Sequence, residues 1–122
     1  MEFDNNIAGY ALGKIETLER RDENARQEGI AGVTQNECTG HITSIAVEKT
    51  FRRSGIATDL MRIMHKEMCS VPSLQSINLL CRVSNIAAIQ HYKIQHGYTC
   101  KFILKAYYAD GEDGWFMEWE RR

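Results

Sequence analysis

The sequence predicts a single α/β domain built in layers, with elements in the order β-β-β-α-β-α-β-β. Short apolar stretches alternate with two segments of helical periodicity, which is the first reason for this class. The composition is the second, because 43% hydrophobic and 25% charged residues are ordinary for a globular protein. A length of 122 residues suits one hydrophobic core. We therefore expect residues 1–122 to form one domain.

The charge and the cysteines argue against several classes of function. A net charge of −1 gives no reason to expect a nucleic acid or a membrane as partner. The four cysteines are widely spaced, without a C-x-x-C pair or a nearby histidine at zinc-ligand spacing, so we expect free thiols and no metal. No apolar run approaches the ~18 residues that span a bilayer, and no targeting pattern opens the chain. These features predict a cytoplasmic protein.

The first part of the chain predicts a hairpin followed by a long connection. Met1–Asp4 and Ile7–Leu18 are strand-like and flank a polar turn at Asn5-Asn6. Small residues such as Gly9 and Gly13 recur on one face of the longer strand, where they would let a helix pack closely. We expect Glu19–Cys38, which is rich in charge and then in glycine, to be an exposed connection.

A central strand from Gly40 to about Glu48 feeds a helix from Gly55 to Cys69. Apolar residues of this helix recur with helical spacing and predict its buried face: Ile56, Leu60, Ile63, Met64 and Met68. The remaining elements, each with local start or stop signals, are a buried strand at Ile77–Val83, a helix at Ile86–His96 between Asn85 and Gly97, a strand at Tyr98–Lys105, a polar loop at Tyr107–Gly114 and a strand at Trp115–Trp119.

The loop before the first helix favours an anion. The first turn of a helix has backbone N–H groups without an intrahelical partner and carries the positive end of the helix dipole. Gly55 has no Cβ and lets a ligand approach the backbone, and Arg52 and Arg53 add charge. The alternative is a surface turn with two solvated arginines, and the loop by itself does not decide between them.

Motifs further along the chain carry a resemblance to a known family. R-x-x-G-x-A at Arg52–Ala57, S-N-x-A-A-x-x-x-Y at Ser84–Tyr92 and H-G-Y at His96–Tyr98 together resemble the acetyl-CoA-binding half of the GNAT superfamily of acetyltransferases. GHITSIAV, FRRSGIA, SNIAAIQHY and YYADGEDGWFM are similar to the catalytic subunit of NatA-type protein N-terminal acetyltransferases, over about residues 1–117. The acidic loop in the last of these stretches is the most distinctive.

The resemblance implies the GNAT fold, a mixed and mostly antiparallel sheet with two main helices and a central strand splayed from its neighbour by a bulge. It implies acetyl transfer from acetyl-CoA to protein N-termini such as Ser or Ala, by direct attack in a ternary complex. The cofactor contacts that it implies are the backbone of Ile45, Ala46 and Val47 for the pantetheine, the loop and first turn for the pyrophosphate (Arg52, Arg53, Ser54, Gly55, Ile56, Ala57 and Thr58), and Asn85 and Tyr92.

Two residues are candidates for catalysis by this resemblance. Tyr92 would protonate or hydrogen-bond the CoA sulfur, since a phenol is a donor at neutral pH; alternatively it is a core tyrosine. His41 would relay a proton from the amine through water; alternatively it is a structural residue at a strand start. Backbone N–H groups near Val47 would stabilise the oxyanion. His41, Arg82, Tyr107 and Tyr108 would line the peptide site, although the tyrosines also suit packing at a strand edge.

The chain departs from this family in two ways. It lacks the family's first strand and first two helices, which form one wall of the peptide site and contact a large helical-repeat auxiliary subunit that presents the enzyme to ribosomes. We expect the uncovered apolar sheet to find a partner, and a second copy of the chain is one. Leu80 stands where many relatives have a histidine, so the base is His41 or the activity is weak. A non-catalytic acetyl-CoA-binding regulator or scaffold is therefore the alternative function, whereas a P-loop is disfavoured because its motif is absent.

Overall fold

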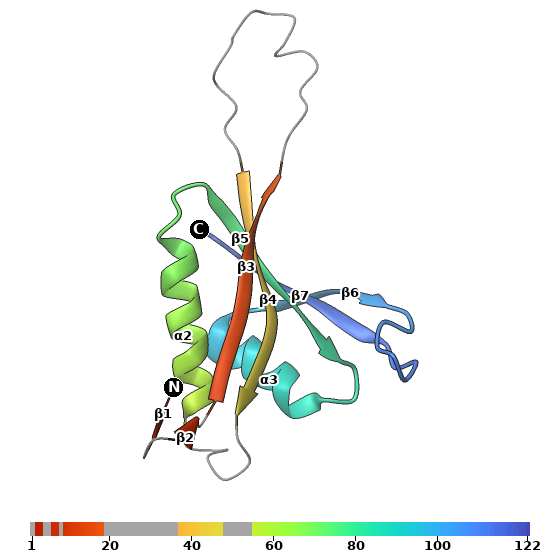
Figure 1. The fold of residues 1–122 in the computed structure, drawn as a ribbon. Helices are drawn as coiled ribbons and strands as arrows, with labels where there is room; N and C mark the ends of the chain where they lie inside the picture. The colour runs from red at the N-terminus through yellow and green to blue at the C-terminus, as the bar shows by residue number, and fades with distance from the viewer. Residues whose placement is uncertain (1, 4–5, 8, 19–36, 48–54) are drawn as a thin grey trace, which may run out of the picture.

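The computed structural model describes residues 2–3, 6–7, 9–18, 37–47 and 55–122. Its elements are β1 (Glu2–Phe3), β2 (Asn6–Ile7), β3 (Gly9–Leu18), β4 (Glu37–Val47), α2 (Ile56–Cys69), β5 (Leu74–Arg82), α3 (Ile86–His96), β6 (Thr99–Leu104) and β7 (Gly114–Glu120) (Figure 1). The bounds of both helices agree with the sequence prediction to within one residue, and the elements from β4 onward follow the predicted order, but four strands rather than the predicted three precede α2.

The main sheet has five strands in the order β3-β4-β5-β7-β6. Every neighbouring pair is antiparallel except β4 and β5, which run parallel. The predicted α/β fold with a mixed, mostly antiparallel sheet is therefore confirmed. The predicted first hairpin was wrong in detail, because β1 pairs with the two-residue β2 in a separate sheet and the long strand β3 begins only at Gly9.

The central strand β4 starts earlier than predicted, at Glu37. Cys38, which the sequence placed in an exposed connection, is 7% exposed, and its N–H donates to the Ser73 carbonyl at 3.0 Å. A single buried residue at the end of a strand has no periodicity of its own, so the sequence could not distinguish it from the loop. The rest of the predicted connection, residues 19–36, lies outside the described residues.

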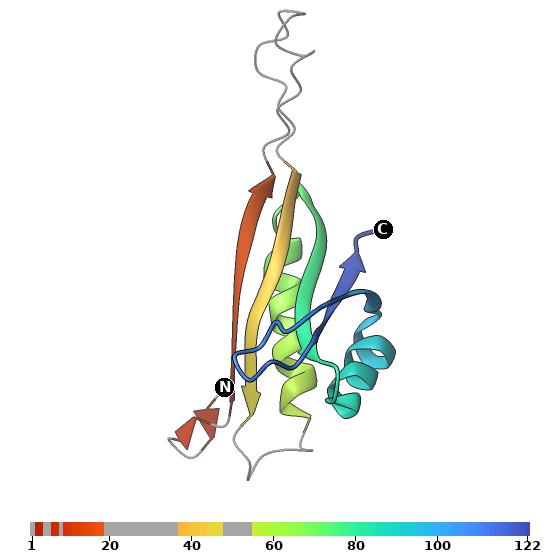
Figure 2. The same cartoon turned by 90° about the vertical axis from the view of Figure 1, so that its right-hand side faces the viewer.

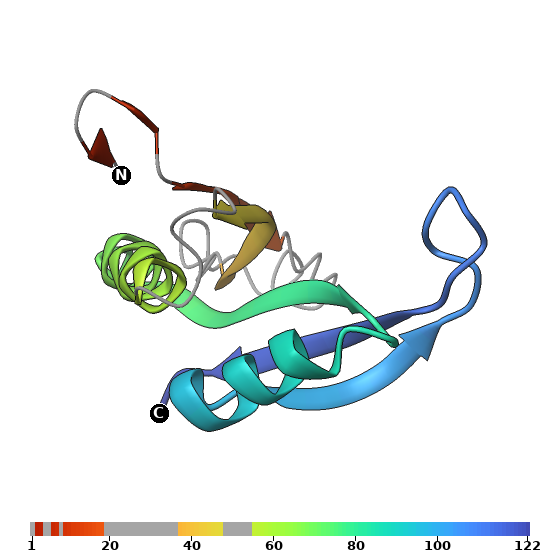
Figure 3. The ribbon, with the colours of Figure 1, turned by 90° about the horizontal axis from the view of Figure 1, so that it is seen from below.

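Both helices cover the same face of the sheet. Figure 2 shows α2 behind β3, β4 and β5, and Figure 3, viewed nearly along α2, shows α3 alongside β6 and β7. The two helices meet through His65 of α2, whose ring lies 6.2 Å from that of His96. The core between helices and sheet includes the fully buried Met61, Leu74, Ile77 and Met117. The other face of the sheet is left without a helix from the described part of the chain.

Glycines of the sheet make room for α2, as predicted for Gly13 of β3, and Gly40 of β4 does the same without having been predicted. A Cβ at Gly13 would lie 2.6 Å from the Met68 methyl, and one at Gly40 would lie 2.5 Å from the Met68 sulfur. The predicted buried face of α2 was wrong at Ile63, which is 52% exposed, whereas Met61 is fully buried. At about 100° per residue the buried arc runs from Ile56 to Met61, and Ile63 falls just outside its edge.

The caps of α3 and the side chain of Arg121, the second residue from the C-terminus, stabilise the C-terminal half. α3 ends at Gly97, whose φ of 74° is left-handed as a glycine C-cap requires. The Arg121 guanidinium donates to the carbonyls of Cys69, Val71 and Leu74, at 2.9, 3.0 and 3.3 Å. It therefore ties the end of the chain to the end of α2. No helix in the described ranges is long and apolar enough to cross a bilayer.

Candidate functional site

A wedge opens where β4 and β5 separate. Their pairing runs from Cys38 opposite Leu74 to Ile42 opposite Leu79, after which β4 continues to Val47 and β5 to Arg82 without further pairing (Figure 1). The register with β3 also shifts here, because Leu12 pairs with Ser44 and Gly13 with Ile42. The skipped residue, Thr43, is a bulge, which bends the strand. The splayed central strand implied by the resemblance is confirmed.

The splayed part of β4 offers backbone groups to a ligand. Ile45 and Ala46 pair with β3 on one side, and no described strand pairs with them on the wedge side. A free strand edge binds extended, amide-containing molecules as an added strand would. The side chain of Val47 is not described, although its backbone belongs to β4. The geometry of this edge thus fits the pantetheine contacts that the resemblance implies.

The first turn of α2 is open in the way an anion site requires. Gly55 is the N-cap with φ of 84°, its carbonyl accepts from the Asp59 N–H at 3.0 Å, and it makes no side-chain cap. A Cβ at Gly55 would meet no atom within 4 Å. The N–H groups of Ile56, Ala57 and Thr58 have no intrahelical acceptor at this end of the helix. Arg52, Arg53 and Ser54 lie outside the described residues.

Tyr92 lies on α3 and packs against the core from the helix side. Burial raises the pKa of its phenol to about 12, with smaller contributions from Cys81 and Tyr108. Cys81 belongs to the part of β5 beyond the last pair with β4, so Tyr92 is beside the wedge. At neutral pH the phenol keeps its proton and can only donate it or share it.

His41 lies on the opposite face of the sheet. Gly40 and Ile42, its neighbours in β4, both face α2, and side chains alternate along a strand. The His41 imidazole Nδ1 is 2.5 Å from the amide oxygen Oδ1 of Asn78 on β5. Sequence reasoning did not identify Asn78, because only the parallel pairing of β4 with β5 places it beside His41.

Arg82 and the loop between β6 and β7 meet on the same face as His41. The Arg82 guanidinium lies 4.1 Å from the centre of the Tyr108 ring and bonds the carboxylates of Asp110 and Glu112, each at 2.8 Å. Tyr107 and Tyr108 contact edge to face at 5.0 Å. The structure therefore brings together three of the four predicted peptide-site residues, Arg82, Tyr107 and Tyr108.

The acidic residues of this loop have structural partners. Glu112 accepts from the backbone N–H of Ser84 at 3.0 Å, and Asp113 accepts from that of Ala106 at 2.8 Å. Gly111 takes a left-handed φ of 89°, which closes the turn. The backbone N–H of Glu112 and the Arg82 guanidinium hold the pKa of Asp110 below its usual range, and bonds from Ser84 and Arg82 do the same for Glu112. No structural reason for this distinctive loop is visible in the sequence, and the three-dimensional contacts supply one.

Asn85 has the capping role that was one of its two predicted roles. Its side-chain oxygen accepts from the Ala88 N–H at 3.2 Å, which satisfies a free donor of the first turn of α3. The side chain is exposed at the open end of the wedge, where Arg82 and Ser84 precede it. A contact between Asn85 and the cofactor stays a prediction.

Three histidines lie behind Tyr92 on the helix side. His91 and His96 approach through their Nε2 atoms at 3.3 Å, and His65 bonds the buried Tyr98 hydroxyl at 2.6 Å. Burial lowers the pKa of all three imidazoles, and the neighbouring His91 and His65 rings and the Arg62 guanidinium help to lower that of His96 to about 4. The cluster is therefore neutral at pH 7. No group of three or more His, Cys, Asp or Glu within the described ranges is arranged to hold a metal.

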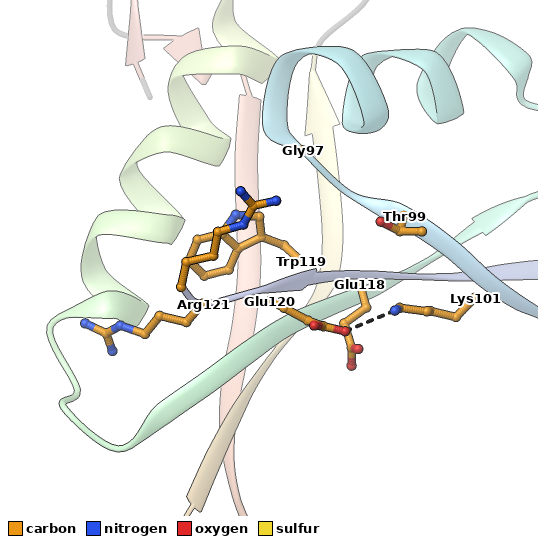
Figure 4. A pocket seen from close by; sticks show the side chains of 8 residues that line it. Gly97, Thr99, Lys101, Glu118, Trp119, Glu120 and Arg121 are labelled. Atoms are coloured by element: carbon orange, nitrogen blue, oxygen red, sulfur yellow. Dashed lines mark hydrogen bonds and ion pairs between the residues drawn. The ribbon is translucent and has the colours of Figure 1, made fainter.

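A hollow beside β6 and β7 does not form part of this site (Figure 4). Two of its three cations are already engaged, since Lys101 pairs with Glu120 at 3.0 Å and Arg121 binds the end of α2. Its lining consists of the end of α3, the two strands and the chain terminus: Gly97, Thr99, Lys101, Glu118, Trp119, Glu120, Arg121 and Arg122. We assign it to the packing of the C-terminus.

Comparison with known proteins agrees with this geometry. The chain matches the Acetyltransferase (GNAT) family over residues 1–98. It is 36% identical over 116 residues to the N-terminal acetyltransferase A complex catalytic subunit NAA10 of Arabidopsis thaliana, covering 95% of this chain and 52% of that protein. It is 37% identical over 117 residues to an N-alpha-acetyltransferase of Saccharolobus solfataricus, covering 93% and 63%. The chain thus spans about half to two thirds of the length of these relatives.

The fold is also that of a chain in a solved structure. The NatC complex bound to Gag peptide and CoA contains a chain that matches with a TM-score of 0.78 at 23% identity, covering 100% of this chain and 66% of that one. At this sequence identity the likeness shows the fold alone. The family match and the two relatives show which family the chain belongs to. With its splayed β4 and β5 and the glycine-capped helix beside them, the chain belongs to the GNAT acetyltransferase family.

Proposed function

We propose that the protein is an N-terminal acetyltransferase that transfers the acetyl group of acetyl-CoA to the α-amino group of protein N-termini. The observation that carries this proposal is the wedge between β4 and β5, with Tyr92 on its helix side and His41 on its opposite side. Acetyl transfer needs a donor for the leaving sulfur and an acceptor for the amine proton. The two faces of one opening supply these two groups.

Acetyl-CoA fits the helix side of the wedge. The free edge of Ile45 and Ala46 suits the amides of the pantetheine, and the open first turn of α2 at Gly55 suits its phosphates. When bound, acetyl-CoA supplies an activated acetyl thioester. Backbone N–H groups near Val47 would stabilise the charge on the thioester oxygen. We propose direct attack by the amine in a ternary complex, without acetylation of the protein itself.

The peptide would approach on the face of His41 and Arg82. An α-amino group has a pKa of about 7.7–8.0, so a weak base is sufficient to deprotonate it near pH 7. Tyr107 and Tyr108 stand at this entrance and would hold the peptide backbone. We propose small N-terminal residues such as Ser or Ala as substrates, and the cytosol, where thiols stay reduced, as the compartment.

Acetyl transfer to short peptides tests this proposal. The 122-residue protein is mixed with acetyl-CoA and peptides that begin with Ser, Ala, Met or Asp, and cofactor binding is measured by calorimetry in the same preparation. We expect transfer to free Ser and Ala termini, and none to N-terminally blocked peptides that keep an internal lysine. Transfer to the lysine of the blocked peptides would contradict Nα specificity. Absence of both binding and transfer would refute the cofactor site.

A non-catalytic acetyl-CoA-binding scaffold is the second candidate function. Leu80 favours it, because this residue lies on the face of His41 and Arg82 and cannot exchange a proton. Binding of acetyl-CoA without transfer to any peptide would select this candidate.

We further propose that β3 pairs with β3 of a second copy of the chain. No described strand pairs with the outer edge of β3, and Tyr10 and Leu12 on it are 47% and 57% exposed. Antiparallel pairing about a two-fold axis at Ile15 would place Lys14 of each copy opposite Glu16 of the other, which is the charge complementarity such a pair needs.

Light scattering after size exclusion measures this self-association. We expect a concentration-dependent dimer that Lys14→Glu weakens and that the swap of Lys14→Glu with Glu16→Lys restores. Lys101→Glu, which breaks a charge pair within one chain, is the control. A monomer at all concentrations would refute the pairing of β3 with a second copy of the chain. The edge of β3 would then be expected to bind a different partner, such as a helical-repeat auxiliary subunit on ribosomes.

A further inference from the structure

His41 and Asn78 form a polar pair at the apex of the wedge. They are direct neighbours in the parallel ladder, one pair before the last contact between β4 and β5. The His41 Nδ1 and the Asn78 Oδ1 are 2.5 Å apart. Both residues are partly buried, so the contact is held in a defined geometry rather than in bulk water.

This contact selects one tautomer of the imidazole. An amide oxygen can only accept a hydrogen bond, so the Nδ1 that faces it must carry the proton. In a neutral ring the lone pair is then on Nε2. No described residue bonds to the His41 Nε2 atom. Every buried side-chain nitrogen and oxygen in the described part of the chain has a hydrogen-bond partner, so Nε2 is not a buried atom. The Nε2 atom is therefore in contact with solvent.

The position of the pair relates this tautomer to the reaction. Ile77 and Leu79 face the core, so Asn78 shares the opposite face with Leu80 and Arg82. Arg82 in turn contacts Tyr108 of the predicted peptide entrance. Leu80 has no titratable group, and Arg82 already pairs with the nearby carboxylates of Asp110 and Glu112, so we take the His41 imidazole at the apex of the wedge as the base on this side.

We propose that Asn78 is a positioning residue that holds His41 in the tautomer with hydrogen on Nδ1, so that Nε2 takes a proton from the attacking amine through water. This inference rests on the proposed acetyl transfer. The ammonium gives one proton to Nε2 by way of the water, and the nitrogen forms its bond to the acetyl carbon. The bond from carbon to sulfur breaks with its electron pair on sulfur, and the second nitrogen proton passes to the sulfur.

Nuclear magnetic resonance of the free protein tests the positioning without any turnover. Long-range proton–nitrogen correlations of nitrogen-15-labelled protein, at a pH where the imidazoles are neutral, report which ring nitrogen carries hydrogen, and His41→Gln identifies the signals. We expect His41 to carry it on Nδ1 in the natural protein and in Asn78→Asp, which keeps an acceptor. In Asn78→Leu we expect the hydrogen to shift toward Nε2. Hydrogen on Nε2 in the natural protein would overturn the proposal.

Steady-state kinetics test the consequence for the reaction. For Asn78→Leu we expect kcat to fall by about tenfold, a part of what general-base catalysis contributes, with the KM for acetyl-CoA unchanged. Asn78→Asp should retain most of the activity. An unchanged kcat for Asn78→Leu, with its tautomer shifted, would overturn the role in proton transfer. If no form transfers acetyl groups while the tautomer result holds, the proposed function fails and the positioning of His41 stands.

Discussion

Replacement of Tyr92 by phenylalanine tests how the leaving sulfur is stabilised. The phenol has a pKa of about 12, whereas a free thiol has one of about 8.5. Complete transfer of the phenolic proton to a thiolate would therefore be uphill by about 3.5 pKa units, or about 5 kcal/mol. Tyr92 should act as a hydrogen-bond donor to the sulfur, and the proton should come from the amine.

The size of the effect follows from this role. A hydrogen bond to a charged group contributes about 1.5–3 kcal/mol, which corresponds to a fall in kcat of about 10- to 150-fold in Tyr92→Phe. Acetyl-CoA affinity should be nearly unchanged, because the ring and its packing remain. Release of free CoA at saturating acetyl-CoA and peptide measures kcat, and calorimetry measures the affinity.

Tyr98→Phe is the matched control for Tyr92→Phe. Tyr98 is a buried phenol whose ring lies 6.0 Å from that of Tyr92, but its hydroxyl bonds His65. This variant should lose stability and keep its kcat. An unchanged kcat in Tyr92→Phe would remove Tyr92 from the mechanism. A loss beyond about 10³-fold would instead show that the phenol transfers its proton completely.

Gly55, Asn85 and His96 each have a local role that a substitution can test. Gly55→Val should abolish acetyl-CoA binding measured by calorimetry, whereas Gly111→Val, which imposes the same left-handed strain of about 1–2 kcal/mol in another loop, should keep it; equal affinities would refute the phosphate site. Asn85→Ala should lower the free energy of unfolding in urea by about 0.5–2 kcal/mol, and Asn85→Asp by much less. Equal losses in the two variants would show that the bond from the Ala88 N–H to Asn85 does not stabilise the helix. The unfolded chain binds the His96 proton more tightly than the folded protein does, because the pKa of His96 is lower in the folded state. The contribution of neutral His96 to the free energy of unfolding should therefore be complete above pH 6.5 and decrease as the pH falls toward 4. In His96→Gln the urea midpoint of unfolding should decrease less between pH 6.5 and pH 4. The same decrease in both proteins would show that His96 does not cause it.

Elements with local signals could be predicted from the sequence. α3 has the predicted bounds because Asn85 caps one end and Gly97 takes the left-handed conformation at the other. These signals act within one or two turns of the chain and need no tertiary context. The strand and the glycine that begin and end one continuous stretch before α2 could be predicted as well, whereas the splay of that strand was implied only by the family resemblance.

Contacts between distant segments could not be predicted in this way. Asn78 meets His41 across 37 residues of sequence, and Arg82 meets Glu112 across 30. Periodicity identifies the faces of a strand and does not tell which residue of another strand lies opposite. The exposure of Ile63 shows the same limit, since its spacing fits a buried stripe whose edge is set by the packing of α2 on the sheet.

The sequence by itself determined the bounds of the two helices and the glycine at the start of α2, and its resemblance to a family named Tyr92 and His41 as candidates. Only the tertiary structure decided that these two residues lie on opposite faces of one opening and that Asn78 contacts the His41 ring. The reason is physical. Caps, turns and periodicity are properties of neighbouring residues, whereas the parallel register of β4 and β5, and its end at the bulge, depend on how the whole sheet packs against its helices.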